Sequence, residues 1–214
     1  RIGLEPEAQT GNIVTLAANS PYTGLVDGQN LIGGQGTVGD HQFINKAIEK
    51  QNEDIKASIY YALTIQNAML PIHQEIIKYY NYFIIYLPKD IVAGDFYWFT
   101  HISERKKNCD MSFFAVVDCT GHGVPGGFLS MIGSRILGTI VNENRIFEPD
   151  KILRKMDKNL RTALRQEHTE IDDGMDVCLC RIEKQVGESG KDSPGEGTFL
   201  SFSGARRSLY LVRG

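Results

Sequence analysis

The chain has 214 residues, of which 42% are hydrophobic and 23% charged, a composition typical of a globular protein of one domain with an appendage. Its net charge of −3 provides no sequence-wide basic field, so we expect no nucleic acid partner. No run of about 18 apolar residues and no signal-peptide pattern occurs, so we expect no direct membrane insertion and predict a cytoplasmic location. The four cysteines fit no zinc-knuckle spacing and are interpreted as reduced thiols.

The first 70 residues divide into a glycine-rich stretch and a helix. Residues 1–40, with one weak strand candidate at 12–18, are interpreted as a linker or the remnant of an upstream domain. Residues 41–70 predict a helix that Pro71 ends. Its heptad pattern, with a second seam that is half polar, indicates a marginal coiled coil; the main seam is Ile48, Ile55, Ala62 and Met69. Two interpretations stay open: a dimerising signalling helix, or an amphipathic helix packed on its own domain.

Residues 71–214 show a mixed pattern of strands and helices. We expect strands at 79–87, 94–100, 111–117, 175–182, 197–203 and 208–212, and a polar turn at 186–196. Helices are expected at 126–141 and from Pro149 onwards, with Asp150 as the N-cap of the second. Strands on both sides of a helical pair predict an α+β fold in which a sheet is layered with helices. The basic pair Arg206 and Arg207 is interpreted as solvated loop charge.

The most informative motif is the run VVDCTGHG at residues 116–123, in which a buried apolar strand leads directly into Asp118. Burying an unpaired carboxylate is costly, so Asp118 needs a cation or many hydrogen-bond donors. Hard oxygen ligands suit Mg²⁺ or Mn²⁺, and the backbone carbonyl of Cys119 is a natural additional ligand. On these grounds alone, a structural turn with a capping aspartate remains an equal alternative.

Two further acidic residues stand at strand ends. Asp95 follows Gly94 at the start of one predicted strand, and Asp176 begins another after an acidic loop. Three acidic strand ends in one small sheet domain favour a metal site over solvated loops. Lys89 is a candidate phosphate contact, with a surface lysine as the alternative. His122 belongs to the turn and is not assigned as general acid merely because histidine titrates near neutrality.

Several ordered motifs resemble the bacterial SpoIIE-type branch of the protein phosphatase 2C-like family. They are IQNAMLP at 65–71, PKDIVAGDFYW at 88–98, DCTGHGVPG at 118–126, DGMD at 173–176, FSGA at 202–205 and LYLVR at 209–213. The similarity covers roughly residues 55–214. It implies an α-β-β-α sandwich, two central Mn²⁺ or Mg²⁺ ions with a third in some members, and hydrolysis of phosphoserine or phosphothreonine on a partner protein in bacterial signalling. An anti-sigma-factor antagonist is a common type of substrate among similar proteins.

The resemblance also implies roles for individual residues. Asp118 corresponds to the metal-bridging aspartate, Cys119 offers its backbone carbonyl, and Asp95 corresponds to an aspartate near the second metal. Asp176 lies where some members have an acidic residue near a third, weaker metal site. The turn consists of Gly121, His122 and Gly123.

The chain departs from the family pattern in two ways. Trp98 stands where many relatives carry a second aspartate, and the downstream Asp-Gly and Asp-Asp motifs would lie beyond Gly214. We therefore expect residues 71–214 to be a partial phosphatase domain that lacks its C-terminal third and is weakly active or inactive, in a parent protein tethered to a sensor domain. The alternative from another class is a catalytically incomplete relay module that binds phosphoproteins or dimerises. A metal-independent structural domain is a third alternative.

Overall fold

The computed structural model describes residues 38–104, 109–185 and 197–212. The chain divides into two compact units, Arg1–Lys56 and Ala57–Gly214. Helix α1, Val38–Met69, ends just before Pro71 as predicted, and its last turns belong to the second unit. The predicted strand at 12–18 and the predicted polar turn at 186–196 lie outside the described residues.

Helix α1 carries its predicted heptad seam on the surface. Ile48 and Ile55 are each half exposed, and Ile44 and Ile65 of the companion seam are also exposed. An exposed apolar stripe is compatible with a coiled-coil partner, and homodimerisation through 41–70 stays a prediction.

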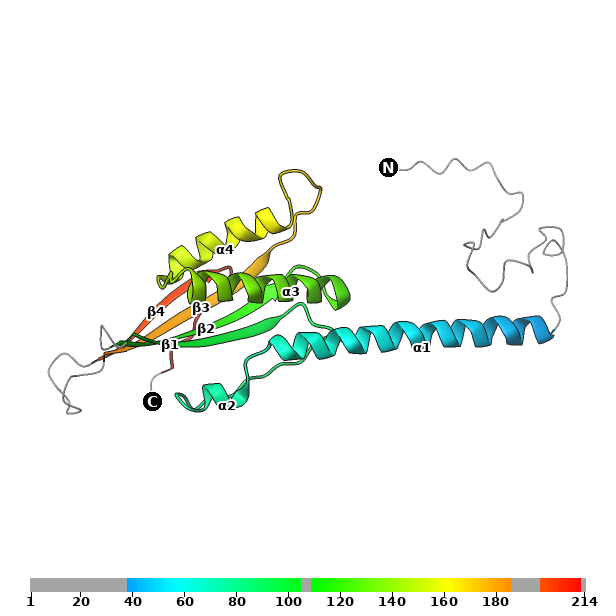
Figure 1. Ribbon diagram of the computed structural model, residues 1–214, viewed down its shortest axis with the longest axis horizontal. Helices are drawn as coiled ribbons and strands as arrows, with labels where there is room; N and C mark the ends of the chain where they lie inside the picture. The colour runs from blue at the N-terminus through cyan, green and yellow to red at the C-terminus, as the bar shows by residue number, and fades with distance from the viewer. Residues whose placement is uncertain (1–37, 105–108, 186–196, 213–214) are drawn as a thin grey trace. The chain divides into compact units, whose positions relative to one another are not determined.

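The second unit is built on one antiparallel sheet of four strands in the order β1-β2-β3-β4 (Figure 1). The strands are β1 Phe96–Glu104, β2 Cys109–Cys119, β3 Met175–Gln185 and β4 Thr198–Ala205. They confirm four of the six predicted strands, each somewhat longer than its sequence pattern indicated. Successive side chains of a strand point to opposite faces, so each strand has one face under the helices and one face away from them.

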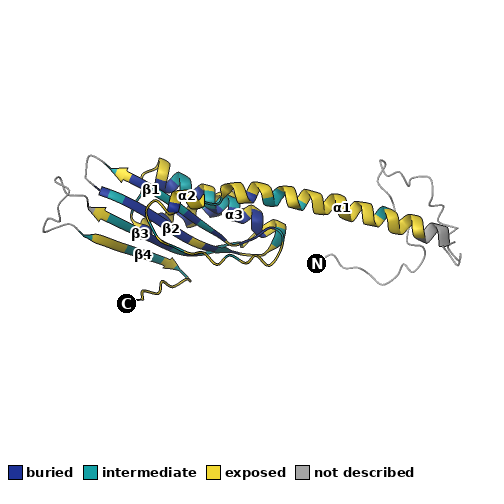
Figure 2. Cartoon of the chain, turned by 90° about the horizontal axis from the view of Figure 1, so that it is seen from below, coloured by how far each residue is buried: buried dark blue, intermediate teal, exposed yellow. Residues whose placement is uncertain are grey.

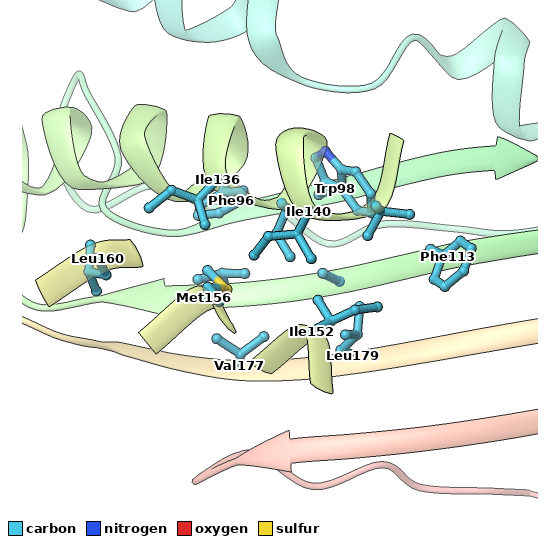
Figure 3. Packing of buried hydrophobic residues seen from close by; sticks show 14 of the residues in the cluster. Phe96, Trp98, Phe113, Ile136, Ile140, Ile152, Met156, Leu160, Val177 and Leu179 are labelled. Atoms are coloured by element: carbon cyan, nitrogen blue, oxygen red, sulfur yellow. The ribbon is translucent and has the colours of Figure 1, made fainter. Parts of the chain in front are cut away.

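Two helices cover one face of this sheet (Figure 1). Helix α3, Gly123–Gly138, continues into a π-helical turn, η2 Thr139–Glu143, and α4 spans Pro149–Ala163. Between the helices and the sheet lies the hydrophobic core, which Figure 3 shows from close by. Its fully buried residues include Phe113, Leu137, Ile140, Ile152 and Leu179. Burial of each such side chain contributes about 1.5–3 kcal/mol to the free energy of folding, because its apolar surface is removed from water.

The start of α4 corrects one prediction. Glu148 is the N-cap, Pro149 occupies the first helical turn, and Asp150 lies in that turn as an acidic residue. Proline explains the shift, because its fixed φ and missing N–H suit the first helical position, which leaves the cap to the residue before it. Asp150 still faces the positive end of the helix dipole.

One helical segment satisfies a length-and-composition criterion for crossing a membrane. The stretch Gly123–Glu143 has a mean hydropathy of 1.3 in its most apolar window, of which 44% is buried inside the protein. Its buried side chains, among them Leu137, Ile140 and Val141, belong to the same core as the sheet. Packing against the sheet is therefore enough to explain its apolar character.

Two predicted strands are absent. Residues 79–87 and 208–212 lie outside helices and strands, and a short helix, α2 His73–Ile76, precedes the first of them. Both segments are rich in β-forming residues, yet strand formation needs a neighbour for the backbone hydrogen bonds, and neither pairs with a strand in the described part of the chain. Their side chains are correspondingly exposed, including Phe83, Leu87, Tyr210 and Val212.

The face of the sheet away from α3 and α4 is only partly covered. Tyr79 stacks on His101 with ring centroids 3.8 Å apart, and Tyr80 meets Phe114 edge to face at 5.0 Å. Farther along β2, Val116 is 61% exposed. Figure 2 shows exposed positions along β4 as well. The fold is thus a mixed helix and antiparallel-sheet arrangement; the second sheet of the predicted sandwich is not among the described residues.

Candidate functional site

The strand register brings the predicted acidic residues to one level of the sheet. Asp118 and Asp176 pair directly across β2 and β3. Phe96, the first residue of β1, pairs with Val117 of the antiparallel strand β2. Extending this register by one residue places Asp95, just before β1, beside Asp118. Because Val117 is buried under the helices, its neighbour Asp118 lies on the opposite, open face, and Asp176 shares that face as its cross-strand partner.

Two like charges directly opposite each other on neighbouring strands destabilise a sheet unless a cation compensates them. That cation is an arginine. The Arg207 guanidinium forms an ion pair with Asp118, and its Nε lies 3.8 Å from Asp176 Oδ2. Arg206 Nε lies 3.7 Å from Asp176 Oδ1. The interpretation as solvated loop charge was therefore wrong for Arg207, which the turn places against two carboxylates, whereas Arg206 keeps a largely solvated side chain, 86% exposed.

The backbone after β4 makes this fold-back possible. Arg206 adopts a left-handed conformation with φ of 58° and forms an isolated parallel bridge with Val177. A Cβ at Gly204 would lie 2.2 Å from the Arg207 carbonyl oxygen, so only glycine permits the turn. The turn thus holds both arginines beside the start of β3, where Asp176 lies.

A second close approach joins the Asp95 loop to the Asp118 turn. A Cβ at Gly94 would lie 2.6 Å from the Gly121 carbonyl oxygen and 3.6 Å from that of Cys119. Glycine at position 94 therefore lets the two backbones touch, and the Cys119 carbonyl lies in the contact. The predicted backbone ligand is accordingly beside the loop that carries Asp95.

The turn after β2 is also fixed to the loop before β3. Thr120 N–H and its hydroxyl group donate to the Gly174 carbonyl at 3.0 and 3.1 Å, and Gly174 N–H donates to the Thr120 hydroxyl oxygen at 2.9 Å. These bonds couple the segments that follow Asp118 and precede Asp176, and they restrict the relative movement of the two carboxylates.

His122 and Lys89 meet at the start of α3. His122 Nδ1 lies 2.6 Å from Asp90 Oδ2, and Lys89 Nζ lies 3.4 Å from His122 Nε2. The His122 side chain is 65% exposed, so the group is open to solvent. The structure therefore places Lys89 against His122, and its phosphate contact stays a prediction. It also adds Asp90, whose role no local sequence signal indicated.

The cysteines are unsuited to nucleophilic chemistry. All four are free thiols. Burial raises the pKa of Cys119 to about 12, with the nearby Asp95 carboxylate adding to the effect, and burial raises the pKa of Cys180 to about 12. A thiol needs to ionise to attack phosphorus, so a cysteine-based phosphatase mechanism is disfavoured.

The donors fit one hard divalent cation better than two. Among the described residues, no three or more His, Cys, Asp or Glu side chains form a group that could hold a metal ion. The donors that do come together are two carboxylates, Asp118 and Asp176, with the Cys119 carbonyl close to Asp95. Mg²⁺ keeps several waters and takes only one or two carboxylates, so this set matches a single hydrated ion. A second ion needs more carboxylates than this part of the chain provides.

Comparison with known proteins supports the fold. No family model matches the chain, and no curated protein matches it. Among solved structures, the chain is similar to the SiaA-PP2C domain of Pseudomonas aeruginosa, with a TM-score of 0.51 and 29% sequence identity, over 61% of this chain and 50% of that chain. The chain thus spans half the length of that solved domain. The predicted likeness to the phosphatase 2C family is confirmed at the level of the fold, whereas the SpoIIE branch stays a prediction.

Proposed function

We propose that this chain carries the site of a metal-dependent protein serine/threonine phosphatase of the SpoIIE type that acts in bacterial signalling. The observation that carries the proposal is the row of Asp95, Asp118 and Asp176 at one level of the sheet, beside a glycine turn. The likeness to a phosphatase 2C domain supports the same class of enzyme.

Each residue has a task that the family resemblance implies. Asp118 would hold two Mn²⁺ or Mg²⁺ ions, Cys119 would add its carbonyl, Asp95 would serve the second ion and Asp176 a third, weaker site. The described donors by themselves match one hydrated ion at Asp118 and Asp176, so the further ions would need additional ligands. Such ions would supply an acidified water as nucleophile and would neutralise charge on the phosphoryl group. Lys89, whose ammonium group lies 3.4 Å from His122 Nε2 in the glycine turn, would attract the phosphoprotein.

The proposed substrate is a phosphoserine or phosphothreonine protein, such as an anti-sigma-factor antagonist, in the cytoplasm. Helix 41–70 is proposed to form a homodimer, which the exposed Ile48 and Ile55 support. Replacing both by Asp should convert a dimer to a monomer in sedimentation, because charge at core positions of a coiled coil is unfavourable. A mass that stays the same would contradict the dimer.

A second function is a relay module that binds a phosphoprotein without hydrolysing it. The absence of a three-ligand side-chain group among the described residues favours it. The two functions differ in turnover: the relay module retains a phosphopeptide in the presence of Mn²⁺ without releasing phosphate.

The deciding experiment compares phosphate release by the 214-residue chain and two variants. Substrates are p-nitrophenyl phosphate and a phosphoserine peptide, with Mn²⁺ or with EDTA. Asp118→Asn should abolish the Mn²⁺-dependent rate. Asp110→Asn is the matched control, because Asp110 lies on the same strand and the same face at its other end. Release that persists in EDTA or in Asp118→Asn would rule out a phosphatase mechanism that depends on a metal at Asp118.

A further inference from the structure

The Arg206–Arg207 turn has chemistry that the proposed mechanism leaves unused. Arg207 contacts both Asp118 and Asp176, and its side chain is 46% exposed. Arg206 contacts Asp176 and is largely exposed. Two guanidinium groups thus face the carboxylates of Asp118 and Asp176, and the charges of these four groups sum to zero.

A divalent cation and Arg207 compete for Asp118. Arg207 pairs with one carboxylate oxygen of Asp118, Oδ2, and its positive charge repels a cation that binds to the same carboxylate. Binding of a metal at Asp118 and Asp176 therefore favours movement of the guanidinium away from them. The displaced group stays within a side-chain length of the site.

The released guanidinium has a natural ligand in the same place. Arginine presents a planar fork of N–H donors that matches two oxygens of a phosphoryl group, and it remains charged at any physiological pH. A phosphomonoester entering beside the acidic row would meet this fork. The half-exposed side chain leaves room for the approach from solvent.

The turn itself can stay fixed during the exchange. Gly204 and the bridge between Val177 and Arg206 hold the backbone beside β3. Only side-chain torsions of Arg206 and Arg207 need to change, and exposed side chains change rotamer in picoseconds to nanoseconds. The exchange thus requires no rearrangement of the sheet.

We propose that Arg207, assisted by Arg206, recognises the substrate phosphoryl group, and that its guanidinium neutralises Asp118 and Asp176 until a divalent cation displaces it. This inference rests on the proposed function, since it assigns the phosphate-binding group of the same site. It assigns to Arg207 the role for which the sequence suggested Lys89.

The test measures Mn²⁺ binding and phosphate binding separately. Free Mn²⁺ is followed by electron paramagnetic resonance, and inorganic phosphate by its inhibition constant and by calorimetry with Mn²⁺ present. Arg207→Gln should bind Mn²⁺ more tightly by roughly 3- to 10-fold, because a competitor is gone, and phosphate more weakly by roughly 10-fold or more, because charge-assisted hydrogen bonds are lost. The KM for a phosphopeptide should rise together with the phosphate inhibition constant.

Two further variants separate charge from geometry. Arg207→Lys keeps a positive charge near the carboxylates but loses the bidentate fork, so Mn²⁺ affinity should change little while phosphate binding weakens. Arg145→Gln is the matched control, since Arg145 is also 46% exposed and also pairs with a carboxylate, Glu104, at 2.9 Å. It should leave both affinities unchanged. Circular dichroism of each variant checks that it is folded.

The outcomes distinguish the inference from the proposed function. If Asp118→Asn loses Mn²⁺ but Arg207→Gln binds Mn²⁺ and phosphate as the unaltered chain does, the inference is overturned and the metal site stands. If Arg207→Gln shows both shifts while no variant releases phosphate, the inference is supported and catalysis fails. If the unaltered chain and Arg207→Gln both bind no Mn²⁺, both proposals are overturned.

Discussion

Substitution of Gln66 by methionine should lower the free energy of unfolding by about 3 kcal/mol. Gln66 lies near the end of α1 and is only 3% exposed. Its Nε2 donates to the Ala93 carbonyl at 2.6 Å and to the Ser130 hydroxyl oxygen at 2.8 Å, and its Oε1 accepts from the Ala93 N–H at 3.0 Å. One amide thus joins α1 to the loop before Asp95 and to α3.

The magnitude follows from these three hydrogen bonds at about 1 kcal/mol each. Methionine has a similar length, so little of the loss comes from a cavity. The substitution removes the hydrogen bonds that Gln66 makes with the N–H and carbonyl groups of Ala93. A buried polar group left without a partner costs about 1–3 kcal/mol. For a unit of this size, about 1 kcal/mol shifts Tm by roughly 2–4 °C, so the expected fall is roughly 6–12 °C.

Thermal and urea unfolding followed by circular dichroism measure the effect. Gln74→Met is the matched control, because it makes the same change at an exposed position of α2, where the effect should stay within about 0.5 kcal/mol. Ser130→Ala removes one partner and should cost about 1 kcal/mol. A Gln66→Met protein that unfolds at the same temperature as Gln74→Met would refute the reasoning.

Three more predictions concern packing and ionisation. Gly94→Ala should lower the free energy of unfolding by about 1–3 kcal/mol, measured by chemical denaturation, because the new Cβ would lie 2.6 Å from a backbone oxygen. Gly138→Ala should raise it by about 0.5–1 kcal/mol, because no atom lies within 4 Å of a Cβ at that helical position. Burial lowers the pKa of His101, so the stability that neutral His101 contributes is present above its unfolded pKa of about 6.5 and is lost as the pH falls below that value. The Tm of His101→Gln should therefore fall less than that of the unaltered chain between about pH 7 and pH 5. An equal fall in both proteins would contradict this prediction. Burial raises the pKa of Cys119 and of Cys180 to about 12, so both thiols should react with a disulfide reagent at pH 8 only when the chain unfolds. Rapid labelling of these two cysteines in the folded chain would contradict this prediction.

The elements that could be predicted are those whose signal is local. The apolar run of β2 and the turn-spaced apolar residues of α3 and α4 determine their type within one window of sequence. Asp118 could be found in the same way, because a buried strand, an acid and a glycine turn follow one another. The register of β1, β2 and β3 then placed Asp95 and Asp176 beside it.

The features that were missed depend on contacts between distant segments. The β-like pattern at 79–87 gave a wrong prediction because strand formation is decided by a partner rather than by propensity alone. Arg207 meets Asp118 through a turn that only the folded chain reveals, and Asp90 meets His122 likewise. A pair of arginines after a strand is indistinguishable in sequence from solvated loop charge.

The position of the candidate site is a consequence of the hydrophobic core. Phe96, Val117 and Val177 point into the core under the helices, and each directly follows or precedes one acidic residue of the row. Since the side-chain period of a strand is two, burial of these residues forces Asp118 and Asp176 onto the other face. A one-residue slip of β2 would carry Asp118 into the core, at the cost of burying a charge. The packing energy that fixes the register therefore also keeps Asp118 and Asp176 on the open face, where a cation and a phosphate can reach them.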